Sequence, residues 1–204
     1  KGNEARAAAL AELASLLHRM RTDPQLGQRI ERAEQEPLNA EQRANLREIH
    51  RGWRQATALP ESLVQARELA HARCEHAWRR QRPANDWNGF LGNFREVLKL
   101  AREEARLLQR QSGAPLYDNL MDRFEPGMTS ARVDHLFGDL QSWLPGLIRQ
   151  VRDKQATHTP VRPQGPFATA AQRRLSEQVM RWFGFDFDAG RLDVSAHPFC
   201  GGVP

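Results

Sequence analysis

The stretch GFDFDAGRLDVSAHPFCGG, residues 184–202, is the part of this 204-residue chain whose apolar residues stop repeating at helical spacing. Within it Leu192, Val194 and Ala196 alternate with polar residues, which is the two-residue period of a β-strand with one buried face. Pro198 ends the alternation. Because a lone strand leaves its backbone N–H and C=O groups without partners, the expected strand needs a second one, which the remaining sequence does not obviously supply.

Upstream of this stretch, apolar residues recur at positions i, i+3, i+4 and i+7, the pattern of amphipathic helices. Asn39 with Gln42 three residues later resembles a capping box, and Asp86 is a good N-cap for another helix. The sequence therefore predicts a mainly all-α fold, a multi-helix array followed by the short C-terminal strand. The expected helices span about 4–21, 24–33, 40–56, 61–80, 86–112, 116–124, 130–152 and 169–183.

Two of these segments carry more specific predictions. In segment 4–21 the face predicted to be buried is the apolar stripe Ala9, Leu10, Leu13, Leu16, Leu17 and Met20. In segment 130–152, Pro145 should bend or break the helix, because proline lacks the N–H that a helix interior requires.

The domain organisation predicted from composition has three parts. Residues 1–152 form a helical N-terminal region, and residues 153–168, with three prolines and no periodicity, form a linker or loop. Residues 169–204 add one more helix and the strand. We expect a single domain that is truncated.

Composition and charge exclude several classes of protein. Thirty Lys and Arg against 25 Asp and Glu give a net charge of +5, but the charges are interspersed, which favours solvated helix faces over a nucleic-acid interface. No apolar run reaches the roughly 20 residues that cross a bilayer, so no membrane partner is expected. Cys74 and Cys200 lie too far apart in the sequence to suggest a disulfide framework, and a reducing cytoplasm is the expected location.

The densest cluster of metal-ligating residue types is His71, Cys74, Glu75 and His76. Residues three and four positions beyond His71 share its helix face, so the first three side chains could hold a soft divalent metal. A zinc site would still need a fourth ligand, and an ordinary, partly buried cysteine among polar residues explains the cluster more simply. The 204 residues contain no H-E-x-x-H, H-x-x-E-H or C-x-x-C motif.

His197, Pro198 and Phe199 form the other candidate site. A histidine at the end of an amphipathic strand, followed by proline and an aromatic residue, suits the wall of a binding cleft. Alternatively, Pro198 merely terminates an edge strand while Phe199 fills the core. The residues alone leave both interpretations open.

Together, four segments make the chain resemble the thermostable carboxypeptidase (carboxypeptidase Taq) family of metallocarboxypeptidases. They are EARA at 4–7, RCEHAW at 73–78, YDNLMDRFEPG at 117–127 and, most specifically, residues 184–202 with the H-P-F sequence. The resemblance implies a homodimeric enzyme that removes C-terminal amino acids from peptides. It also implies one divalent metal, zinc or alternatively cobalt, bound by an H-E-x-x-H helix that would follow the H-P-F strand.

The resemblance further implies that this chain is a fragment from the N-terminal half of such an enzyme, inactive by itself. His197, Pro198 and Phe199 would line the substrate cleft beside a small sheet, and no residue of this chain would be a catalytic group or metal ligand. Two alternatives remain: a non-enzymatic helical module whose basic surface binds an acidic partner or RNA, and a metal site formed by the His71 cluster itself.

Overall fold

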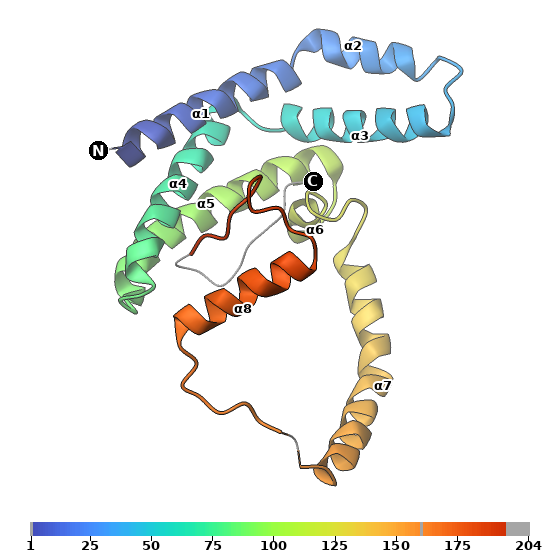
Figure 1. Cartoon of the computed structure of the whole chain (residues 1–204). Helices are drawn as coiled ribbons and strands as arrows, with labels where there is room; N and C mark the ends of the chain where they lie inside the picture. The colour runs from blue at the N-terminus through green and yellow to red at the C-terminus, as the bar shows by residue number, and fades with distance from the viewer. Residues whose placement is uncertain (1, 160, 195–204) are drawn as a thin grey trace. The chain divides into compact units, whose positions relative to one another are not determined.

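The computed structural model describes residues 2–159 and 161–194, and in these residues the backbone forms eight α-helices and no β-strand (Figure 1). The prediction of a mainly all-α fold is confirmed. The helices are α1 (Gly2–Arg21), α2 (Pro24–Ala33), α3 (Ala40–Thr57), α4 (Glu61–Gln81), α5 (Trp87–Ser112), α6 (Leu116–Met121), α7 (Ser130–Ala156) and α8 (Thr169–Trp182).

The structure describes only part of the expected C-terminal strand. Residues 191–194 have no regular secondary structure, and the rest of the predicted strand lies outside the described residues. His197, Pro198 and Phe199 are among the residues not described, so their proposed position beside a cleft stays a prediction.

Side chains that cap the helix ends fix where the helices begin, as the sequence predicted. Both hydrogen bonds of the α3 capping box form: Gln42 N–H donates to Asn39 Oδ1, and Asn39 N–H donates to Gln42 Oε1, each at 2.9 Å. At the start of α5, Asp86 Oδ1 accepts a hydrogen bond from Gly89 N–H at 2.9 Å. These bonds satisfy N–H groups that the first helical turn leaves without a backbone partner. Gly113 ends α5 with a φ of 74°, a conformation that favours glycine.

The face that α1 buries is not the predicted one. Ala7, Ala11 and Ser15, at i, i+4 and i+8, are buried, and α1 packs against α4. The predicted leucine stripe is wrong, since Leu13 is 51% exposed and Met20 is 63% exposed. Helix α1 therefore buries a face of small side chains rather than its leucines.

The core between α4 and α5 combines apolar packing with a buried ion pair. Leu63 and Ala70 of α4 pack with Leu100 of α5. One turn further along α5, the Glu104 carboxylate accepts hydrogen bonds from Arg67 of α4 at 2.7 Å and from Arg123, just after α6, at 2.6 Å. Burial lowers the pKa of the Arg67 guanidinium, and the Glu104 charge opposes that effect. The ion triad therefore joins three parts of the chain across the core.

Helices α2 and α3 lie side by side (Figure 1), held closely together at one glycine. A Cβ placed on Gly27 of α2 would lie 2.8 Å from Cζ2 of Trp53 on α3, which is closer than atoms can pack without moving. Gly27 therefore allows the indole ring to lie directly against the α2 backbone.

The chain divides into two compact units, Lys1–Gly138 and Asp139–Pro204. Helix α7 continues through Pro145 to Ala156, so the proline does not break it. The predicted division at 152 and 168 stays a prediction. None of the helices in the described residues is both long enough and apolar enough to span a membrane.

Candidate functional site

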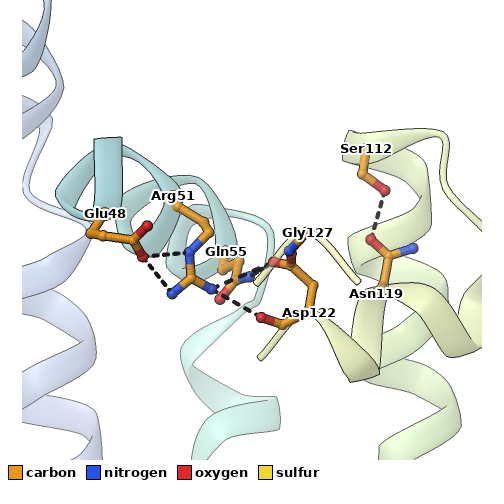
Figure 2. Close-up of polar contacts among 7 residues, drawn as sticks. All are labelled: Glu48, Arg51, Gln55, Ser112, Asn119, Asp122 and Gly127. Atoms are coloured by element: carbon orange, nitrogen blue, oxygen red, sulfur yellow. Dashed lines mark hydrogen bonds and ion pairs between the residues drawn. The ribbon is translucent and has the colours of Figure 1, made fainter. Parts of the chain in front are cut away.

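The segment from the end of α5 to the start of α7 is fixed by polar side chains that bind backbone groups. Asn119 is 8% exposed, and its Nδ2 donates to the carbonyl oxygens of Ala114 and Pro115, both at 2.9 Å. Its Oδ1 accepts a hydrogen bond from Ser112 Oγ at 2.7 Å (Figure 2). This amide therefore holds the turn between α5 and α6 closed.

The preceding residue, Asp118, fixes the start of α7. Its Oδ1 accepts hydrogen bonds from Ser130 N–H at 3.0 Å and from Ser130 Oγ. Because the N-terminus of a helix carries partial positive charge and unpaired N–H groups, a carboxylate there is stabilising. Thr129 Oγ1 accepts a further bond from Arg132 N–H at 3.2 Å.

Asp122 connects the same segment to α3 (Figure 2). Its Oδ1 accepts from Gly127 N–H at 2.8 Å, and its Oδ2 accepts from Gln55 Nε2 at 2.7 Å. Arg51 Nη1 donates to the Asp122 carbonyl at 3.1 Å, while Arg51 Nε donates to Glu48 at 2.9 Å. Residues 67 and 71 positions apart in the sequence are thus held together by charge-assisted hydrogen bonds, which are stronger than neutral ones.

These contacts frame a pocket of about 730 Å³ between α3 and the α5–α7 connection, which we call the α3 pocket. Its volume lies within the range typical of ligand sites in proteins. The basic residues lining it are Arg43, Arg47, His50, Arg51 and Arg54, all from α3. The acidic residues are Glu34, Asp118 and Asp122, and the apolar ones include Leu38, Leu46, Leu108 and Met128.

The cluster around His71 does not form a metal site. Throughout residues 2–159 and 161–194, no three His, Cys, Asp or Glu side chains are grouped so that they could hold a metal ion. Glu75 Oε1 instead accepts a hydrogen bond from Arg79 Nη2 at 2.5 Å. Burial raises the pKa of the Cys74 thiol, which disfavours the thiolate that metals bind. The described residues therefore do not fit a catalytic divalent metal, and we assign no chemical step to them.

Sequence reasoning used residues 117–127 only as a mark of family resemblance and missed their structural role. The available signal was the placement of Asp118 and Asp122, four residues apart on a short helix that is followed by a turn. Carboxylates at such positions are suited to bind backbone N–H groups at helix and loop ends. The partners on α3, however, lie too far away in the sequence to be recognised from this pattern.

Taken alone, this architecture defines a mainly helical protein with a polar pocket. A family model described as Carboxypeptidase Taq (M32) metallopeptidase matches residues 1–204. The chain therefore belongs to this metallopeptidase family, as the resemblance predicted.

Individual relatives agree with this assignment. The chain is 36% identical to thermostable carboxypeptidase 1 of Thermus thermophilus, in an alignment that covers 98% of this chain and 41% of the relative. Among solved structures, Trypanosoma cruzi metallocarboxypeptidase 1 is 43% identical with a TM-score of 0.71, covering 98% of this chain and 41% of that one. The Pyrococcus furiosus carboxypeptidase is 26% identical with a TM-score of 0.71, covering 97% and 40%. The chain thus spans about two fifths of the length of the curated relatives that it matches.

Proposed function

We propose that this chain is part of a metal-dependent carboxypeptidase, which removes C-terminal amino acids from peptides by the attack of a metal-activated water. The observation that carries the proposal is the family match over residues 1–204. The 43% identity to Trypanosoma cruzi metallocarboxypeptidase 1 supports it. The family implies a divalent metal, which we propose to be zinc, with cobalt as the alternative.

We propose further that the 204-residue chain has no carboxypeptidase activity by itself. Its sequence contains no H-E-x-x-H motif, and its described residues form no metal-binding group. The metal would be bound by a region corresponding to the part of the relatives that this chain does not match. His197, Pro198 and Phe199 would line the substrate cleft and position the peptide. We also propose that the whole enzyme is a homodimer and that it is located in the cytoplasm.

A chimera tests the proposal. The matched 41% of Trypanosoma cruzi metallocarboxypeptidase 1 is replaced by this chain, and release of C-terminal amino acids from an N-blocked peptide is measured. We expect the chimera to release amino acids and a chelator to abolish the release. The 204-residue chain alone, with added zinc or cobalt, should release none.

Two outcomes would contradict these statements. A chimera that is helical, monodisperse and loaded with one metal ion, yet inactive, would show that this chain cannot replace its counterpart in a carboxypeptidase. Amino-acid release by the purified 204-residue chain would show that the proposed inactivity is wrong.

A further inference from the structure

We propose that the α3 pocket binds an acidic peptide segment, with Arg47 and Arg54 each pairing with one carboxylate of the ligand. The described residues that line the pocket all lie between positions 34 and 129, and the proposal does not depend on carboxypeptidase activity. It rests on three features of the pocket: the orientation of its basic residues, their pairing, and their spacing.

The basic residues of the pocket lie on one face of α3. At 100° per residue, Arg43, Arg51 and Arg54 lie within about 40° of Arg47 around the helix axis, and His50 lies about 60° away. Glu41 and Glu48, the acidic residues of α3, lie about 100° or more from Arg47 on the same basis. Of these two, Glu48 pairs with Arg51 of that face, and neither pairs with Arg47 or Arg54.

Each carboxylate of the pocket accepts a hydrogen bond or ion pair, whereas two of its guanidinium groups have no partner among the described residues. Glu34 of the pocket pairs with His50 at 3.0 Å, and Asp118 and Asp122 have the hydrogen bonds described above. In contrast, Arg47 and Arg54 are exposed, and their guanidinium groups make no hydrogen bond or ion pair with any of the described residues. An incoming carboxylate would therefore meet two unpaired guanidinium groups, whose planar donors match carboxylate geometry.

The spacing of the two free arginines matches a short peptide. Seven residues of α-helix separate Arg47 from Arg54, which corresponds to about 10.5 Å along the axis. In the polyproline II conformation, common in unfolded peptides, residues i and i+3 lie on the same face about 9.3 Å apart. Two acidic side chains three positions apart can thus reach both arginines at once, with the flexible side chains taking up the difference.

The other lining residues favour a peptide over a nucleic acid. Leu46, Leu108 and Met128 give the pocket an apolar part that can contact the aliphatic portions of a peptide. Among the described residues no Phe, Tyr or Trp lines the pocket, whereas proteins that bind single-stranded nucleic acid stack bases on such rings. A concave pocket of about 730 Å³ also suits a few amino-acid residues better than an extended phosphate backbone.

The probe is a fluorescent hexapeptide, blocked at both ends, with glutamate at its second and fifth positions and alanine elsewhere. The matched probe carries glutamine at those two positions. Binding to the 204-residue chain is measured by fluorescence anisotropy. The test variant is Arg47→Gln/Arg54→Gln. The control variant is Arg95→Gln/Arg102→Gln, which removes two exposed arginines, also seven residues apart, from α5 outside the α3 pocket.

We expect the glutamate peptide to bind the unaltered chain with a Kd at least about tenfold lower than for the test variant, a difference of about 1.4 kcal/mol. The control variant should bind within about twofold of the unaltered chain, because it loses the same net charge away from the pocket. The glutamine peptide should bind none of the three proteins measurably. Added salt should weaken binding of the glutamate peptide.

Each of the following results would overturn the proposal. The glutamate peptide fails to bind the unaltered chain, or the glutamine peptide binds equally well. The control variant loses as much affinity as the test variant, which would indicate a general charge effect. Finally, a single-stranded oligonucleotide displaces the peptide at lower concentration than the unlabelled peptide does, which would identify a nucleic-acid site.

Discussion

Replacing Glu104 by alanine tests the ion triad that joins α4, α5 and Arg123, which lies two residues beyond α6. The Glu104 side chain is 3% exposed, and that of Arg67 is 13% exposed. Both Arg67 and Arg123 donate to the same oxygen, Glu104 Oε1. Removing the carboxylate leaves the Arg67 guanidinium buried without its charged partner, and water cannot fully replace that partner at so small an exposure.

The expected loss follows from this burial. Breaking a buried ion pair by removing one partner typically costs about 3–5 kcal/mol. Because the Arg123 side chain is 36% exposed and can be rehydrated, we expect the lower end, about 3 kcal/mol. At an m-value of about 2 kcal/mol per M urea, the unfolding midpoint should fall by about 1.5 M. Glu104→Gln keeps an oxygen acceptor and should lose about half as much.

The assay is urea unfolding of the 204-residue chain, followed by circular dichroism at the helical minimum. Glu103→Ala is the matched control, because Glu103 is the exposed neighbour on the same helix and should change stability by less than about 0.5 kcal/mol. A double-mutant cycle with Arg67→Ala should give a coupling energy of about 1–2 kcal/mol. Equal midpoints for the Glu103 and Glu104 variants would refute the assignment of a stabilising role to this carboxylate.

Three further predictions concern other parts of the chain. Gly27→Ala should destabilise the chain by about 1–3 kcal/mol in urea unfolding, because the new Cβ meets the indole ring of Trp53. Gly52→Ala, which has open space around it, should stabilise the chain by about 0.5–1 kcal/mol. Equal effects of the two substitutions would contradict the close packing at Gly27. In a Cys200→Ser background, alkylation of Cys74 should be slow near neutral pH and accelerate only as the pH rises through the raised pKa of its thiol. The stability that the protonated thiol contributes is present below the unfolded-state pKa and is lost as the pH rises through the folded-state pKa. In the active chimera, His197→Ala should lower kcat/KM without lowering metal content, and loss of the metal would show that His197 is a ligand.

Helix ends could be predicted from the sequence because their causes are local. The hydrogen bonds between Asn39 and Gln42 join residues three positions apart, and Asp86 binds Gly89 over the same interval. Such bonds form from the residue types and their spacing alone, whatever packs against the helix later. A residue such as Gly113, just past the last periodic position, gives an equally local signal for a helix end.

The buried face of α1 could not be predicted in this way. The helix carries a leucine-rich face and a face formed by Ala7, Ala11 and Ser15, and hydrophobicity alone selects the leucines. The choice depends on which face α4 contacts, and that is a property of the packed pair of helices. Periodicity thus identifies an amphipathic helix, but it does not decide which of two possible faces will meet a neighbour.

The charge distribution around the α3 pocket explains why interspersed charges in a sequence do not imply a neutral surface. Along α3, Glu41 and Glu48 are interspersed among four arginines, and at 100° per residue both lie about 100° or more around the helix axis from Arg47. The acidic residues that do line the pocket, such as Asp118 and Asp122, are engaged with Ser130 and with α3. The oxygens of these carboxylates thus have partners, while the guanidinium groups of Arg47 and Arg54 have none among the described residues, so the fold leaves two unpaired cations at this pocket.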